Sequence, residues 1–180
     1  MTTGREVTVD DAAFLEAFSE HLDRLHNLAR GLTRTAEDAE DLVSETCLLA
    51  LRGWRRQRPD DPAAWFATIC LNACRSSYRR SAARPVEVAA DAWLLARPDE
   101  RADTARSALA AVSSRRVREA IAELPRPQLE AITLMDLAGY TAAQTAQIVG
   151  APRGTVLARV HRGRKALARA LAPERDGGAW

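Results

Sequence analysis

The stretch 141–171 restricts the fold of this chain more than any other part of the sequence, because several independent signals agree there. Thr141 and Gln144 match a capping box, in which a hydroxyl caps a helix and a glutamine three residues later reaches back to the cap. The helix that follows is short and stops at Gly150, a residue suited to the left-handed backbone of a tight turn. A second helix is predicted to begin near Pro152.

Spacing within this stretch predicts a helix-turn-helix. Ala146 lies four residues before Gly150, and Val156 lies six residues after it. These spacings put a small residue where the two helices cross and an apolar anchor inside the second helix. The apolar stripe of the second helix consists of Val156, Val160, Gly163 and Leu167.

The other side of the second helix is suited to duplex DNA. At about 100° per residue, the residues opposite the apolar stripe are Thr155, Ala158, Arg162 and Lys165. Small residues at Gly154 and Ala158 let a helix lie deep in a major groove. Arg159, Arg162 and Arg164 can reach phosphates or guanine edges. The alternative is a basic, solvated helix end whose cations oppose the helix dipole.

The rest of the chain also favours helices. Of its 180 residues 47% are hydrophobic and only 5% aromatic, a balance that suits helices better than strands. Apolar periodicity and capping signals predict helices at 10–32, 35–56, 62–80, 114–124 and 127–138. We therefore expect an all-α fold of two small helical domains joined by a flexible linker, the C-terminal one a helix-turn-helix domain without a wing. The expected domains are 10–81 and 113–172, and the linker is 82–112, in which we allow a short helix around 93–95.

Charge is distributed unevenly along the chain. The net charge is only +2, but the segment 37–45 holds five acidic residues and no basic one. The segment 151–175 holds seven basic residues and one acidic residue. This polarity predicts two different partners, an anion for the C-terminal segment and a basic partner for the acidic segment.

The predicted helix 35–56 has two distinct faces. Its core stripe consists of Ala39, Val43, Cys47, Ala50 and Trp54. The carboxylates Asp38, Asp41 and Glu45 fall within about 60° of one another on a different side. Three leucines are expected to flank those carboxylates outside the core stripe, namely Leu42, Leu48 and Leu49. Leucines beside clustered acids suit a basic, partly apolar protein partner, and a solvated acidic helix start with a broad core face is the alternative.

The predicted helix 62–80 and the loop before it carry the opposite charge. Asn72, Arg75 and Arg79 share a face with Trp65. More arginines cluster in and before the loop, at Arg52, Arg55, Arg56 and Arg58. Arginines interleaved with aromatic rings suit single-stranded or distorted DNA, where bases stack on rings and arginine holds the backbone. The alternative is that Trp54 and Trp65 are simply core residues.

No catalytic or metal-binding pattern stands out. Cys70 and Cys74 lie four residues apart on one predicted helix, but two ligands do not complete a structural zinc site. Together with Cys47 we interpret them as small buried hydrophobes, and a redox-sensing role has no support. We predict neither enzyme activity nor a cofactor, because no phosphate loop, nucleophile elbow or metalloprotease motif occurs. With no signal peptide and no apolar run that approaches a membrane span, a cytoplasmic protein is expected.

Three stretches carry a family resemblance. They are DAEDLVSETCLLAL at 38–51, PAAWFATICLN at 62–72 and GTVLARVHRGRKAL at 154–167. In this order they resemble the extracytoplasmic-function (ECF) sigma factors, the minimal promoter-recognition subunits of bacterial RNA polymerase. The resemblance covers roughly 22–80 and 116–171, which is most of the chain.

The resemblance implies a role for each surface. The acidic helix would dock on the β′ clamp of core RNA polymerase, with the β flap as a further polymerase contact, and its binding residues would be Asp38, Asp41, Leu42, Glu45, Leu48 and Leu49. The loop 55–61 and the helix after it would recognise and open the minus-ten element through Arg55, Arg56, Arg58, Trp65, Asn72, Arg75, Arg79 and Arg80. The helix-turn-helix would read the minus-thirty-five element through Arg153, Gly154, Thr155, Ala158, Arg159, Arg162 and Arg164. An anti-sigma factor is expected as a further partner.

Two other classes of protein remain open from the sequence. The first is a stand-alone helix-turn-helix regulator that never enters polymerase as a subunit. The second is an enzyme or small-ligand domain with a DNA-binding tail. The acidic, leucine-flanked helix and the arginine/tryptophan helix favour the transcription-initiation subunit, because a simple repressor needs neither surface.

Overall fold

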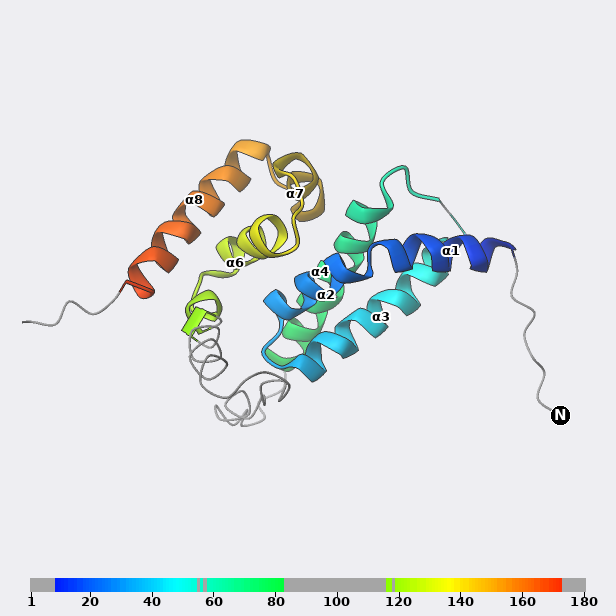
Figure 1. Cartoon of the computed structure of the whole chain (residues 1–180), viewed down its shortest axis with the longest axis horizontal. Coiled ribbons are helices and arrows are strands. Elements are labelled where there is room, and N and C mark those ends of the chain that lie inside the picture. The colour runs from blue at the N-terminus through cyan, green and yellow to red at the C-terminus, as the bar shows by residue number, and fades with distance from the viewer. Residues whose placement is uncertain (1–8, 55, 57, 83–115, 118, 173–180) are drawn as a thin grey trace, which may run out of the picture.

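The computed structural model describes residues 9–54, 56, 58–82, 116–117 and 119–172, and every regular element within them is a helix (Figure 1). The N-terminal helices are α1 (Val9–Glu20), α2 (Leu22–Leu32), α3 (Ala36–Trp54) and α4 (Pro62–Ala82). The C-terminal helices are α6 (Arg126–Ile132), the π-helical turn η2 (Thr133–Leu137), α7 (Ala142–Val149) and α8 (Arg153–Ala170). The expected all-α class is confirmed. The linker beyond residue 82, with the short helix around 93–95, lies outside the described residues.

The single helix predicted at 10–32 is wrong, because the chain breaks at His21 into α1 and α2. His21 has φ −106° and ψ 4°, and its N–H donates to the carbonyl of Phe18 three residues back. The break lets the two apolar stripes face different neighbours. Phe18 packs edge-on against Phe66 of α4 at a centroid distance of 5.2 Å, whereas Leu28 is fully buried among the helices of the bundle.

Side-chain caps start α3 and α4 where the sequence indicated. The hydroxyl of Thr35 accepts the N–H of Asp38 at 3.0 Å, and a carboxylate oxygen of Asp61 accepts the N–H of Ala64 at 3.0 Å. Each bond satisfies one of the backbone donors that a helix start leaves unpaired. The core stripe predicted for α3 is buried at Ala39, Val43, Ala50 and Trp54 and half-buried at Cys47.

The predicted helix-turn-helix is confirmed. Gln144 donates its backbone N–H to the Thr141 hydroxyl at 3.2 Å, and the Gln144 side-chain oxygen accepts the N–H of Thr141 at 3.2 Å, which completes the capping box. Gly150 has φ 68° and ends α7, so the left-handed turn falls on the residue that tolerates it. Val156 is fully buried and anchors α8 against α6 and α7.

The helix predicted at 127–138 changes pitch part-way. It starts as α6 and widens at Thr133, where the N–H of Ala138 donates to the Thr133 carbonyl five residues back at 2.9 Å. Gly139, with φ 71°, then ends it as expected. Such π-helical turns are rare and often lie at functional sites. This one faces the N-terminal domain, where Thr133 is fully buried.

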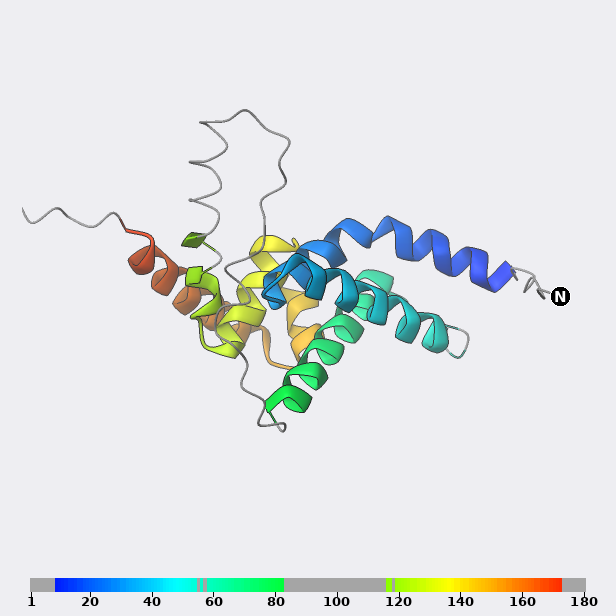
Figure 2. The same cartoon turned by 90° about the horizontal axis from the view of Figure 1, so that it is seen from below.

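The two helical domains are docked against each other. Helices α6, η2 and α7 pack on α2 and α4, and the two views show the C-terminal helices against one side of the N-terminal bundle (Figures 1 and 2). A continuous apolar cluster crosses the boundary and includes Leu134, Ala138, Tyr140 and Ile148 beside the N-terminal core residues. The buried Tyr140 donates its hydroxyl to the carbonyl of Ala63 at 3.3 Å.

Candidate nucleic-acid and polymerase interfaces

The acidic surface of α3 is largely exposed to solvent. Asp38 and Asp41 are exposed, and Glu45 is half-exposed with a carboxylate oxygen 3.9 Å from an arginine nitrogen of Arg80. Two apolar side chains lie bare on the same helix, Leu48 with 58% and Leu49 with 38% of its surface exposed. Clustered acids beside bare leucines make a surface that a basic, partly apolar protein can cover.

Leu42 does not belong to this exposed surface, and the expectation that it flanks the carboxylates outside the core is wrong. It is 6% exposed and packs in the core of the N-terminal domain. The core face of α3 is wider than the predicted stripe, since Thr46 is also fully buried. Its hydroxyl donates to the carbonyl of Leu42 at 2.6 Å, so that no polar atom of this side chain is left without a partner.

The basic face of α4 includes exposed side chains and one that is bonded to the other domain. Asn72, Arg79 and Arg80 are exposed, whereas Trp65 is half-buried and packs against the core beside the buried Trp54. The core alternative therefore describes Trp54 well and Trp65 in part. Arg75 is half-buried and bonded to a carboxylate of the other domain.

Sequence reasoning missed Tyr78, which is 63% exposed beside these arginines. The arginine group of Arg126 lies over its ring, 5.1 Å from the centroid. An open pocket between the domains is lined by Asn72, Arg75, Tyr78, Arg79, Arg126 and Glu130. From the sequence, only the tryptophans were considered as candidates for the core or for DNA contact. Tyr78 could have been found from its position three residues after Arg75, which places the two side chains on the same face of the helix.

The loop between α3 and α4 contributes arginines of two kinds. Arg56 is exposed, and Arg55 lies outside the described residues. Arg58 is exposed but engaged, because it donates to a carboxylate oxygen of Asp10 at 2.8 Å and lies 5.9 Å above the Trp54 ring. A partner that needs the Arg58 charge therefore competes with Asp10.

The side of α8 that the sequence assigns to DNA is open over most of its length. Arg153, Gly154, Ala158, Arg162 and Arg164 are exposed, and Thr155 and Arg159 are half-buried. Arg164 makes a bidentate pair with Asp136, with nitrogen–oxygen distances of 3.0 and 2.5 Å. The opposite side packs on the domain through Val156, Val160 and Gly163. The arrangement leaves small residues and arginines on one surface, as reading of a major groove requires.

The three cysteines lie at different depths, and Cys47 is half-buried. Cys70 and Cys74 are buried, and burial raises the pKa of Cys70 to about 12, which disfavours the reactive thiolate. Among the described residues, no group of three or more histidine, cysteine, aspartate or glutamate side chains is placed to hold a metal ion. None of the described helices has both the length and the apolar character that crossing a bilayer demands.

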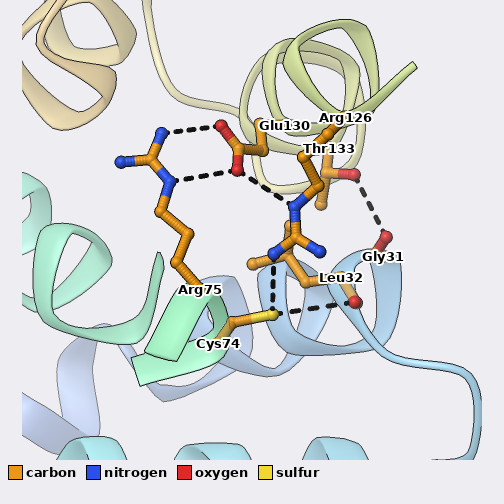
Figure 3. A network of polar contacts seen from close by, with 7 residues as sticks. All are labelled: Gly31, Leu32, Cys74, Arg75, Arg126, Glu130 and Thr133. Carbon is orange, nitrogen blue, oxygen red and sulfur yellow. Dashed lines mark hydrogen bonds and ion pairs between the residues drawn. The ribbon is translucent and has the colours of Figure 1, made fainter. Parts of the chain in front are cut away.

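A polar network joins α4 to α6 across the domain boundary (Figure 3). Glu130, whose side chain is 5% exposed, accepts two hydrogen bonds from Arg75 at 3.1 and 2.7 Å and one from Arg126 at 3.1 Å. Burial opposes ionisation of Glu130, but the bonds and charges of the two arginines outweigh it and lower its pKa. Arg126 also donates to the sulfur of Cys74 at 3.3 Å. The carboxylate is therefore ionised and fully paired in the docked state.

Comparison with known families matches both halves of the chain. Residues 17–84 match the model for sigma-70 region 2, and residues 114–167 match the model for sigma-70 region 4. The ECF RNA polymerase sigma factor SigM of Mycobacterium tuberculosis is 36% identical over 166 residues, which cover 92% of this chain and 80% of SigM. EcfG of Rhodopseudomonas palustris, another ECF sigma factor, is 33% identical over 148 residues, covering 82% of this chain and 78% of EcfG.

Solved structures share the fold. CnrH, determined in complex with the cytosolic domain of CnrY, superposes with a TM-score of 0.65 at 24% identity, over 89% of this chain and 88% of CnrH. The sigma factor RpoE of Bartonella quintana, determined with the anti-sigma factor NepR, superposes with a TM-score of 0.66 at 24% identity, over 91% of this chain and 97% of RpoE.

The chain combines an exposed acidic helix, a basic helix beside aromatic residues and a helix-turn-helix, and both of its halves match sigma-70 regions. This combination defines a promoter-recognition subunit of bacterial RNA polymerase, a sigma factor. The identity and coverage of the relatives place it more narrowly. The chain belongs to the extracytoplasmic-function sigma factors and directs promoter-specific initiation of transcription. The stand-alone regulator is not favoured, because residues 17–84 match sigma-70 region 2.

Proposed function

We propose that the exposed face of α3 is the surface that binds core RNA polymerase, at the β′ clamp. The residues assigned to it are Asp38, Asp41, Glu45, Leu48 and Leu49, without the buried Leu42. The support is the exposure of two large leucines beside three carboxylates on one helix, since a solvated acidic helix would have no need for bare leucines. The β flap is proposed as a second polymerase contact.

DNA recognition is assigned to the two basic helices. The minus-ten element would meet the α4 face and the preceding loop, through Arg56, Arg58, Trp65, Asn72, Arg75, Arg79 and Arg80, to which the exposed Tyr78 is added. Arg55 lies outside the described residues, and its proposed contact with the minus-ten element rests on the sequence alone. The minus-thirty-five element would meet α8 through Arg153, Gly154, Thr155, Ala158, Arg159, Arg162 and Arg164. The domains proposed for these tasks are 10–81 and 113–172.

An anti-sigma factor is proposed as the regulatory partner, and the cytoplasm as the site of action, where polymerase is found. The support is similarity to RpoE of Bartonella quintana, whose structure was determined with an anti-sigma factor. No enzyme activity is assigned to the chain.

Run-off transcription with sigma-free bacterial core polymerase and a promoter library tests the polymerase surface. The wild type is compared with a triple variant, Asp38→Ala, Asp41→Ala and Glu45→Ala. The matched control is Glu40→Ala, which removes an exposed carboxylate about 100° around α3 from Asp41. We expect defined transcripts from the wild type and the control and none from the triple variant. If neither wild type nor variant supports initiation while the protein still binds duplex DNA, the polymerase assignment is wrong.

A further inference from the structure

The interface between the two domains covers part of the face that the proposed function assigns to DNA. Arg75 is the assigned residue that is most deeply engaged, since both of its bonds to Glu130 run from one domain to the other. Arginine binds a carboxylate with the same bidentate geometry that it uses for a phosphate. Glu130 therefore occupies Arg75 as a DNA phosphate would.

We propose that the docked state is a closed, self-inhibited form of the protein, in which the C-terminal domain competes with promoter DNA for the α4 face and Glu130 is the competing group. The inference rests on the proposed role of α4. DNA that reaches α4 must displace Glu130 from Arg75, and the domains must separate.

The reach of the helices supports this inference independently of the ion pair. Elements centred near positions −10 and −35 lie roughly 25 base pairs apart, which is about 85 Å of duplex at ~3.4 Å per base pair. Helix α4 has 21 residues and α8 has 18, so at ~1.5 Å per residue they are about 32 and 27 Å long. Even end to end they would not span the two elements, and here α7, which joins onto α8, packs directly on α4. One docked molecule cannot read both.

Further polar contacts cross the same boundary and hold the closed form together. Arg24 of α2 donates to the carbonyls of Ala138 at 3.2 Å and Gly139 at 3.0 Å, and lies 4.0 Å above the ring of Tyr140. The side-chain amide of Gln144 donates to Asp61 at 3.0 Å. Water can replace all of these polar bonds once the domains part.

Gly31 is the most selective place to test the closed form. A Cβ atom at Gly31 would lie 2.3 Å from Cγ2 of Thr133 and 2.9 Å from a methyl carbon of Leu137, both across the boundary. Thr133 is fully buried, and its hydroxyl oxygen would also lie 2.9 Å from that Cβ, so exchanging the positions of its methyl and hydroxyl groups leaves a close contact. Alanine inside a helix is otherwise favourable relative to glycine. Gly31→Ala thus opposes docking while it favours α2 itself.

Small-angle X-ray scattering on the full chain measures docking directly. The variants are Gly31→Ala and Glu130→Gln, and Glu123→Gln is the matched control, with the same loss of charge at an exposed position of the same domain. We expect both test variants to expand by roughly a third beyond the ~16 Å radius of gyration of a compact 180-residue body. The control keeps the wild-type radius. Circular dichroism confirms that helix content is unchanged.

The same four proteins are titrated with a fluorescent single-stranded DNA oligonucleotide. If the closed form holds about nine-tenths of the molecules, opening it raises apparent affinity about tenfold, because only the open fraction binds. Unchanged scattering in Gly31→Ala, or expansion without tighter DNA binding, overturns the proposal. A different result would count against the proposed sigma role and leave the closed form standing. In that case the wild type fails in run-off transcription, while the test variants still expand and bind DNA more tightly.

Discussion

Helices α8 and α4 each contribute an arginine to a bidentate ion pair with a carboxylate. The pair of α8 lies within its own domain and is exposed, whereas the pair of α4 crosses the domain boundary and is more deeply buried. Arg164 and Asp136 form a bidentate pair within the C-terminal domain, with 61% and 29% of their side chains exposed. Arg75 and Glu130 form a similar pair between domains, with 35% and 5% exposed. Solvent screens the first pair and has little access to the carboxylate of the second.

Glycines show the same contrast. Gly163 of α8 lets Ile132 approach within the C-terminal domain, where a Cβ would lie 2.8 Å from Cγ1 of Ile132. Gly31 allows the equally close approach of Thr133 from the other domain. Contacts inside a domain are lost only when that domain unfolds, whereas contacts between domains can be exchanged for another partner. The difference suggests that the first group specifies structure and the second group specifies a switchable state.

Removing the arginine of each pair should give the largest contrast. Arg75→Ala leaves Glu130 with Arg126 alone. Because the domains can then part and return Glu130 to water, the loss in the free energy of unfolding of the whole chain should be about 1.4 kcal/mol, the equivalent of a tenfold preference for the closed form. Arg164→Ala leaves an exposed carboxylate in water, and its stability should match that of the wild type. Urea unfolding monitored by circular dichroism measures both. Equal losses would mean that burial does not distinguish the pairs.

Substituting alanine for each of the two glycines should give a smaller contrast, which is measured as the difference between the midpoints of thermal unfolding. Gly163→Ala forces a methyl group against Ile132, at a cost of about 1–3 kcal/mol for overpacking, and regains about 1 kcal/mol of helix propensity. The clash that Gly31→Ala creates is relieved when the domains separate, so the N-terminal domain should unfold at the same or a slightly higher temperature. The comparison fails if Gly31→Ala lowers the midpoint as much as Gly163→Ala does.

Local signals predicted the part of the molecule that depends on local contacts. The capping box at Thr141, the turn at Gly150 and the cap at Asp61 each concern bonds between residues within a few positions of one another, and sequence spacing alone indicates them. The bond between Arg75 and Glu130 spans 55 residues, and no spacing rule connects two side chains so far apart.

Burial of single apolar residues was harder to predict than the elements that carry them. Leu42 lies at the edge of the α3 core stripe, where the width of the buried face is set by how closely α2 and α4 approach, not by the sequence of α3. The break at His21 has the same origin, since apolar residues continue at helical spacing through it while the packing partners change.

Acid should open the closed form before it unfolds the domains. The pKa of Glu130 is lowered in the docked state, so its contribution to docking is present above the pKa of the free carboxyl and is lost as pH falls through the lower, docked value. Asp61, whose pKa is lowered by its bond from Gln144, adds a contribution of the same sign. Scattering between pH 7 and pH 3 should show expansion that begins below the usual glutamate range of about 4.3. Glu130→Gln should already be expanded at pH 7 and should show little further expansion as the pH falls.

The smallest effect is expected on DNA binding by α8 when the exposed pair of Arg164 and Asp136 is broken. Asp136→Asn removes the carboxylate that holds Arg164, and so frees one arginine on the α8 face without touching the domain boundary. Binding of nonspecific duplex DNA is electrostatic, and one added phosphate contact steepens the dependence of log affinity on log salt by about 0.9. Fluorescence anisotropy across a salt series measures that slope.

Glu123→Gln, the same loss of one negative charge away from α8, is the control for net charge in this series. We expect Asp136→Asn to bind duplex DNA a few-fold more tightly than this control at low salt, with the steeper slope, because the freed guanidinium is already in place on the exposed face. Its scattering should stay that of the closed form, since Asp136 makes no part of the boundary network. Expansion of Asp136→Asn would show that the two pairs are coupled, and the distinction between structural and switchable contacts would then no longer hold for Arg164.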